Sequence, residues 1–204
     1  MFYEPAKRNH GLPHDPFKAL VAPRPIGWIS TRAKDGRLNL APYSYFNALS
    51  DNPWLVAFAS DGRKDSMTFA AESGEFVANI VTSKFTSAMV RTSVDAPRGT
   101  SEFEFAGLEA EASMLVSAPR VKGVAAALEC KVTEIIQPKL LSGLASEIQL
   151  VIGEVVGIHI DEAMLTSGRF DYEKAGLVSR LGYLDYAVAG PIFEMRRPRW
   201  NAQD

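Results

Sequence analysis

The sequence predicts a mainly β fold, an antiparallel barrel carrying a few short helices. Stretches with the two-residue apolar period of a half-buried strand recur along the chain, and turn residues separate them. Segments with a helical pattern are fewer and shorter. Many strands with few helices favour a barrel with helical decoration. Neither an internal repeat nor a linker divides the chain, so residues 1–204 are predicted to form a single domain.

The composition is that of an ordinary globular domain. Of the 204 residues, 47% are hydrophobic and 23% are charged, which argues against wholesale disorder. With 22 basic and 24 acidic side chains, no overall field attracts nucleic acid or an anionic membrane. The N-terminus lacks the apolar core of a signal peptide, and we expect a cytoplasmic protein. The one cysteine, Cys130, excludes a disulfide within the chain.

An N-terminal arm precedes the first strands. Residues 1–25 are rich in proline and histidine and show no periodicity. Residues 26–33 then alternate as a strand, and Lys34-Asp35-Gly36 is a strong hairpin signal. Residues 37–41 form the return strand, which we expect to end at Pro42 because proline cannot donate to a strand ladder.

A helix is predicted between two apolar strands. Residues 54–60 form a nearly continuous apolar run, which is typical of a buried strand, and residues 75–81 place apolar side chains on one face. Residues 65–73 between them have a helical pattern. Asp65 or Ser66 is the expected N-cap, and a glycine follows the last helical residue.

Two long strands are predicted in the second half of the chain. Residues 124–136 alternate well, whereas residues 148–160 are too many for one flat strand. Gly153 and Gly157 therefore predict bends or bulges, as at a barrel corner. Residues 180–188 supply a last strand or turn. Two more short helices are expected, at residues 84–91 and 162–165.

Several common active sites are missing from the sequence. A G-x-G-x-x-G after a first strand and a G-x-x-x-x-G-K-[ST] are both absent, so neither a Rossmann domain nor an NTPase loop is supported. A G-x-S-x-G elbow is absent too. His10 and His14 flank Gly11 and Pro13, which disfavour a shared helix face, and His159 stands alone on a strand. We predict no metal site.

An anion site is predicted where a loop meets a helix. Residues 60–66 read S-D-G-R-K-D-S and place Arg63 and Lys64 after a glycine turn and before the helix start. A helix N-terminus exposes unpaired N–H groups and the positive end of the macrodipole. Arg63 adds a planar fork, Lys64 a point charge and Ser66 a hydroxyl, while Asp65 is better suited to capping. A solvated loop is the alternative interpretation.

An aromatic segment lies just after the first hairpin. Residues 41–47 read A-P-Y-S-Y-F-N, which either plugs a barrel end or forms a binding lip. As a lip, its flat rings suit a planar heterocycle, and Asn47 with nearby backbone amides suits the polar edge of that heterocycle. The first hairpin begins P-R-P-I-G-W-I-S-T, residues 23–31, where Gly27 permits a close backbone approach to a ligand.

Five motifs follow one another along the chain. They are R-P-I-G-W-I-S-T from Arg24, N-L-A-P-Y-S-Y-F-N from Asn39, N-P-W-L-V from Asn52, G-R-K-D-S from Gly62 and E-F-V-A-N-I from Glu75. In this order the motifs resemble the flavin reductase-like family, the FMN-binding split β-barrel proteins. The resemblance runs from about Phe17 to the Arg196-Arg197-Pro198 segment. One departure is Ser66, where the family commonly has a threonine, and the hydroxyl is kept.

The resemblance implies an antiparallel split β-barrel of Greek-key type with a few short helices. It also implies two protomers that share FMN at their interface. The cofactor-binding residues it implies are Ser60, Arg63, Lys64 and Ser66 for the phosphate with Asp65 beside them, Ser44, Tyr45, Phe46 and Asn47 along the isoalloxazine, Trp28 and Ser30 near the ring or ribityl chain, and Tyr183 over the exposed ring face.

The implied function is that of an FMN-dependent oxidoreductase acting as a homodimer. Such an enzyme passes electrons from NAD(P)H through FMN to flavin or another small-molecule acceptor. Because the cofactor itself accepts the hydride, no catalytic side chain is expected. Two alternatives stay open. One is a flavin-binding electron carrier without its own NAD(P)H activity, and the other is a barrel interaction module without a cofactor.

Overall fold

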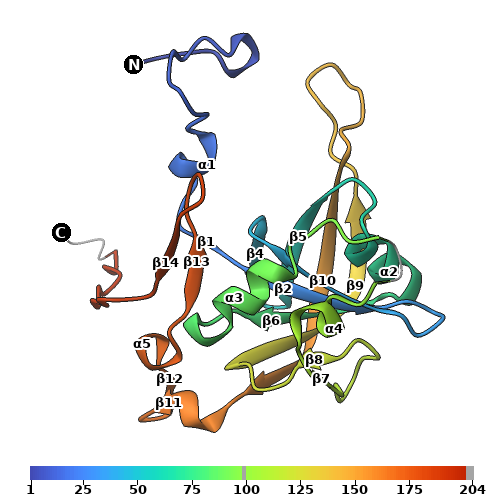
Figure 1. The fold of residues 1–204 in the computed structure, drawn as a ribbon. Coiled ribbons are helices and arrows are strands. Elements are labelled where there is room, and N and C mark those ends of the chain that lie inside the picture. Colours follow the sequence, from blue (N-terminus) through green and yellow to red (C-terminus); the bar gives the residue numbers. More distant parts are fainter. Residues whose placement is uncertain (98–99, 201–204) are drawn as a thin grey trace.

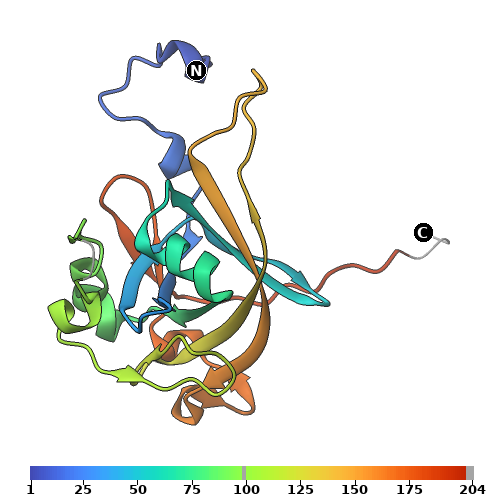
Figure 2. The same cartoon turned by 90° about the vertical axis from the view of Figure 1, so that its right-hand side faces the viewer.

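A curled seven-stranded antiparallel sheet organises the molecule, described here by a computed structural model for residues 1–97 and 100–200. The strand order is β3-β2-β6-β9-β10-β5-β4, and the sheet wraps into a split barrel (Figures 1 and 2). The predicted mainly β fold is confirmed. The strands are β2 (Gly27–Arg32), β3 (Leu38–Tyr43), β4 (Phe46–Asp51), β5 (Trp54–Asp61), β6 (Glu75–Ile80), β9 (Ala126–Ile136) and β10 (Ile148–Ile160).

Smaller elements surround this sheet. A three-stranded sheet joins β1 (Arg24–Pro25), β13 (Val178–Arg180) and β14 (Tyr186–Val188); two further pairs are β7 (Ala110–Glu111) with β8 (Arg120–Val121), and β11 (Leu165–Thr166) with β12 (Arg169–Phe170). The described helices are all too short or too polar to cross a bilayer. They are η1 (Pro5–Lys7), α1 (Phe17–Leu20), α2 (Asp65–Ser73), η2 (Ser83–Phe85), α3 (Thr86–Arg91), α4 (Glu102–Ala106), η3 (Glu162–Met164) and α5 (Tyr172–Ala175).

The first hairpin forms as predicted, but its return strand is longer. The Gly36 turn has φ +92°, and the Ala33 N–H donates to the Arg37 carbonyl at 2.9 Å. The prediction that this strand ends at Pro42 is wrong, because Pro42 pairs with Trp28 inside β3. β3 is an edge strand of the sheet, and an edge tolerates a residue without an N–H.

Other helix and strand boundaries also differ from the predicted ones. Helix α2 begins at Asp65, but its N-cap position is Lys64 and no side chain caps it. The expected glycine end is confirmed, since Gly74 has φ +74°. The aromatic segment is not all loop, because Phe46 already begins β4, a strand that the sequence pattern did not indicate. Residues 180–188, predicted as a last strand or turn, form a hairpin together with residues 178–179.

The long strand β10 bends at its two glycines, as the sequence predicted. Its register against β9 shifts between Ile152 and Gly153 and again between Val155 and Gly157. At Gly153 the fully buried Phe76 ring occupies the space of a side chain, and a Cβ there would lie 2.5 Å from Phe76 Cε1. At Gly157 the nearest atoms would lie 3.4 Å away, which is tight but tolerable.

This contrast predicts a difference between two substitutions in one strand. Gly153→Ala is expected to lower the free energy of unfolding by about 1–3 kcal/mol, because Phe76 must move. Gly157→Ala is the matched control and is expected to change it by less than about 1 kcal/mol. Urea denaturation of both variants measures the difference. Equal effects would show that Phe76 is not held tightly against Gly153.

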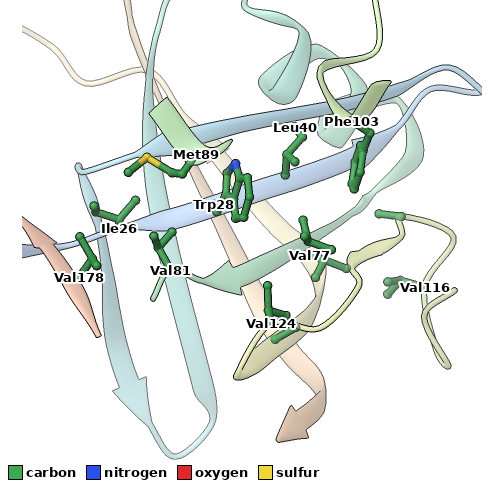
Figure 3. Close-up of a cluster of buried hydrophobic side chains, with 13 residues drawn as sticks. Ile26, Trp28, Leu40, Val77, Val81, Met89, Phe103, Val116, Val124 and Val178 are labelled. Atoms are coloured by element: carbon green, nitrogen blue, oxygen red, sulfur yellow. The ribbon is translucent and has the colours of Figure 1, made fainter. Parts of the chain in front are cut away.

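Two clusters of buried side chains lie on opposite faces of β2. Ile29, Phe58 and Phe76 belong to one of them. Trp28 lies in the middle of the other, which helices α3 and α4 help to cover (Figure 3). The second cluster consists of Ile26, Trp28, Leu40, Val77, Val81, Met89, Phe103, Val116, Ala118, Val121, Val124, Ala127 and Val178.

Of the predicted arm, residues 1–25, the last part forms α1 and β1. Residues 1–16 and the tip of the β9–β10 hairpin project from the same end of the molecule (Figures 1 and 2). The hairpin tip carries the exposed apolar side chains Leu140, Leu141 and Leu144. In contrast, Cys130 is buried in the core, and burial raises the pKa of its thiol. The cysteine is therefore a packing residue.

Candidate functional site

A cavity of about 510 Å³ opens between the start of α2, the β3–β4 connection and the loop after α3. It unites the two segments that the sequence motifs single out, the cationic residues before α2 and the aromatic lip. Its lining residues are Asn39, Ala41, Pro42, Tyr43, Ser44, Tyr45, Ala59, Asp61, Arg63, Lys64, Asp65, Ser66, Thr92, Ser93, Val94, Asp95, Ala96, Glu102 and Ile148.

The cationic end of the cavity is built by a tight turn. Gly62 has φ +71°, and its carbonyl accepts a 3.0 Å hydrogen bond from the Ser60 hydroxyl. Arg63 and Lys64 follow with exposed side chains. The first backbone bond of α2 runs from the Thr68 N–H to the Lys64 carbonyl at 2.9 Å, so earlier N–H groups lie outside the helical ladder. The turn therefore places two cations at a helix N-terminus.

Lys64 has a partner on the opposite wall. Its Nζ lies 3.3 Å from Oδ1 of Asp95, and the two side chains are 54% and 92% exposed. An ion pair as exposed as this one contributes about 0–1 kcal/mol. An anion entering the cavity can thus replace Asp95 as the partner of Lys64 at small cost.

A buried polar network forms one wall beside the cations. The Ser66 hydroxyl donates to Oδ1 of Asn39, and the Asn39 amide donates to Oε2 of Glu102 at 3.0 Å. The Leu40 N–H donates to the same Glu102 oxygen at 3.1 Å. Burial raises the pKa of Glu102, and these donors oppose that shift. Burial likewise raises the pKa of the Tyr43 phenol. Ser66 can therefore donate to an anion only if it releases Asn39.

A second cavity, of about 560 Å³, adjoins the first, since Ser44, Tyr45 and Ala59 line both. Phe46 and Asn47, which the resemblance places along a flavin ring, line this second cavity only. Its walls are mostly apolar. The remaining lining residues are Leu20, Val21, Ala22, Pro23, Arg24, Pro25, Leu49, Ala57 and Leu150.

Three of the residues predicted to bind the cofactor lie inside the protein instead. Trp28, Ser30 and Ser60 are fully buried and line neither cavity. The Trp28 indole N–H donates to the Thr92 hydroxyl at 2.8 Å, and Ser60 bonds the Gly62 carbonyl. A side chain without exposed surface cannot touch a ligand, so these three side chains are not among the proposed contacts. Trp28 therefore supports a residue of the first cavity wall and Ser60 the turn before α2, whereas the Ser30 hydroxyl donates to the carbonyl of Pro119, which lines neither cavity.

Tyr183 lies in the turn between β13 and β14, with φ +53° and half of its surface exposed. Its carbonyl accepts a 2.5 Å hydrogen bond from Arg180 Nη2, and its ring centroid lies 5.7 Å from that of His14. The side chain lines neither cavity. Its role over an exposed ring face stays a prediction.

His159, which stood alone in the sequence, is paired with Glu129 across β9 and β10. Burial alone would raise the pKa of Glu129, but the Met114 and Leu115 N–H groups and His159 outweigh it and hold that pKa below its usual range. Glu129 therefore anchors the loop that carries Met114 and Leu115, and His159 is its partner from β10. Among the residues that the structure describes, no group of His, Cys, Asp and Glu is arranged to hold a metal ion.

Asp95, Glu102 and Arg24 are among the cavity-wall residues that the sequence did not indicate. Asp95 and Glu102 come from the loop and helix that follow α3, and no motif marked them. Arg24 lies within the R-P-I-G-W motif but was assigned no role. Only 7% of the Arg24 surface is exposed. Such burial is unusual for arginine and could not be inferred from the motif.

The comparisons with known proteins agree with this fold and with these motifs. A family model described as "Flavin reductase like domain" matches residues 20–177, a range that ends before Tyr183. Nitrilotriacetate monooxygenase component B from Bacillus cereus has a TM-score of 0.85 and 33% identity, over 96% of this chain and 98% of that chain. The 2-nitrobenzoate 2-nitroreductase NbaA from Pseudomonas fluorescens has a TM-score of 0.79 and 28% identity, over 89% and 88%.

A relative from Aquifex aeolicus (strain VF5) is 35% identical over 176 residues, which are 83% of this chain and 86% of the relative. The likeness therefore extends over nearly the full length of both proteins.

Proposed function

The chain belongs to the flavin reductase-like family, and on that premise we propose that it is an FMN-dependent oxidoreductase. It passes electrons from NAD(P)H through FMN to flavin or another small acceptor. One observation carries the proposal: a single cavity joins Arg63 and Lys64, at the N-terminus of α2, to the aromatic lip around Tyr45.

The residues of this cavity fit the chemical groups of FMN. A volume of about 510 Å³ is typical of a small-molecule site. Two cations and the N–H groups at the start of the nine-residue helix α2 suit a phosphate monoester. The lip and the adjoining apolar cavity suit a planar ring. Carboxylates line the cavity as well, those of Asp61, Asp65, Asp95 and Glu102. Asp95 already faces Lys64, and the bonds of Glu102 to Asn39 and Leu40 hold its Oε2 oxygen toward the protein.

When bound, FMN supplies the redox chemistry, accepting a hydride from the donor and passing two electrons to the acceptor. Arg63 and Lys64 would hold the phosphate. Ser44 and Tyr45, which line both cavities, would orient the ring between them. The second cavity would leave one side of the ring open to the nicotinamide and later to the acceptor. The protein thus binds and orients, and no side chain needs to transfer a proton.

We also propose that the protein acts in the cytoplasm as a two-fold homodimer. The exposed leucines of the β9–β10 hairpin tip support association with a second copy of the chain, because projecting apolar side chains favour association. Sedimentation at micromolar concentration tests this: a protein that stays monomeric would contradict it.

The enzymatic proposal predicts reduction of the bound flavin by a nicotinamide. Purified protein reconstituted with FMN is mixed anaerobically with NADH and, separately, with NADPH, and the visible flavin absorbance is followed. We expect at least one donor to bleach it rapidly. A flavin that stays oxidised with both donors, but is reduced quickly by a redox partner protein, would indicate an electron carrier instead. A colourless protein that takes up no FMN would refute both flavin functions.

A further inference from the structure

Arg24 is a buried cation in the wall of the second cavity. Its guanidinium donates to the carbonyl oxygens of Lys18 at 2.6 Å, Val21 at 2.5 Å and Leu181 at 2.9 Å. Its Nε approaches the Ser44 hydroxyl at 3.5 Å, the limit of a hydrogen bond. These partners come from three separate segments, α1 with the residues after it, the β13–β14 turn and the aromatic lip.

The charge of Arg24 is not neutralised by any of these partners. They are carbonyls and a hydroxyl. The centroid of the Tyr45 ring lies 5.8 Å from Cζ, and the residue opposite Arg24 in strand β13 is Arg180, a second cation. Within the described part of the chain, no carboxylate lies at ion-pair distance from Arg24. A guanidinium stays protonated in proteins. Carbonyl dipoles solvate such a cation but leave its net charge, and buried charges are as a rule paired.

The charge of Arg24 lies beside both cavities. Tyr45 and Ser44, both in contact with Arg24, line the first and the second cavity. Burial removes most of the water that would screen the charge, so its field extends into the adjoining space. An electron pair arriving in that space is stabilised without any rearrangement of the protein.

We propose that Arg24 is an electrostatic positioning residue, which makes the site bind the reduced, anionic form of a flavin more tightly than the oxidised, neutral form. This inference rests on the proposed FMN function and deepens it, because it names a residue that sets the reduction potential. The positive charge of Arg24 acts on a flavin from behind Ser44 and Tyr45. The hydrogen bonds of Arg24 hold its guanidinium in that place.

Charge and hydrogen bonding can be separated because the local packing does not depend on Arg24 alone. A Cβ added to Gly182 would lie 2.5 Å from Ala19 Cα, so the β13–β14 turn already lies directly on α1. Arg24→Gln removes the charge and keeps an amide donor. Arg24→Lys keeps the charge and loses the planar fork. Arg32→Gln is the matched control, since the Arg32 Nε bonds one carbonyl, that of Ser117, at 2.7 Å, and lines neither cavity.

The test measures the dissociation constants of oxidised and reduced FMN under anaerobic conditions, together with the midpoint potential. Arg24→Gln is expected to lose about tenfold of the preference for reduced FMN, which corresponds to a potential lower by about 30 mV for a two-electron couple. Arg24→Lys and Arg32→Gln are expected to stay within about twofold of the wild-type preference.

An Arg24→Gln protein that binds FMN with an unchanged potential would overturn the inference and leave the proposed function standing. A wild-type protein that takes up neither form of FMN would instead refute the proposed function itself. Should Arg24→Gln fail to fold, Arg24→Lys decides the matter. A folded lysine variant with a clearly lowered potential would show that the hydrogen bonds, and not the charge, set the potential, which also overturns the inference.

Discussion

Replacing Arg63 and Lys64 together with alanine is expected to give a folded protein that has lost most of its FMN. A charge-assisted hydrogen bond contributes about 1.5–3 kcal/mol net, so losing two weakens binding by about 3–6 kcal/mol, or roughly 10²- to 10⁴-fold. Both side chains are exposed, and the Lys64–Asp95 pair is a weak surface contact. We therefore expect little change in stability.

The measurements are the flavin content of the purified variant and its dissociation constant for FMN. Arg169→Ala with Lys174→Ala is the matched control, an exposed pair of cations that lines neither cavity. Riboflavin, which lacks the phosphate, provides a second control, because the double variant should bind it as the wild type does. Equal weakening for FMN and riboflavin would show that these cations do not hold the phosphate.

The sequence predicted much of the sheet because alternation and glycine placement are local signals. The bends at Gly153 and Gly157 show this, since a strand of 13 residues must curl and glycine is where it can. The continuation of β3 through Pro42 could not be predicted from the same signals. Whether a proline ends a strand depends on whether that strand lies at a sheet edge, and strand order is a property of the whole fold.

One end of the cavity could be predicted from local sequence signals, and the opposite wall could not. Arg63 and Lys64 are marked by a turn and a helix start that lie next to them in sequence. Glu102 and Asp95 are not, because Glu102 reaches Asn39 across 63 positions of sequence and Asp95 reaches Lys64 across 31. The cationic end could thus be located from the sequence, whereas Glu102 and Asp95, which come from distant segments, could not.

Trp28 shows where a motif and a fold can disagree. Alternation in β2 assigns Trp28 and Ser30 to one face, but it does not say what covers that face. In the structure Met89 of α3 and Phe103 of α4 lie over it, so the face is core (Figure 3). The motif R-P-I-G-W therefore places Trp28 behind the cavity wall, where its N–H holds Thr92.

Trp28→Ala is expected to lower the free energy of unfolding by about 3–5 kcal/mol, since it removes a large, fully buried side chain. The same substitution at Trp54, which is 59% exposed, is the control; it is expected to change stability by less than about 1 kcal/mol. Urea denaturation measures both. If the two variants are equally stable, Trp28 cannot be the centre of the core cluster.

The milder variant Trp28→Phe separates a core role from a contact with flavin. It keeps most of the ring volume and loses the bond to Thr92, which costs about 1 kcal/mol of stability. Trp28 is fully buried and lines neither cavity. The FMN affinity of the Trp28→Phe protein is therefore expected to stay within about threefold of wild type. A folded Trp28→Phe protein with FMN affinity reduced more than about tenfold, or 1.4 kcal/mol, would instead support the direct ring contact that the family resemblance implied.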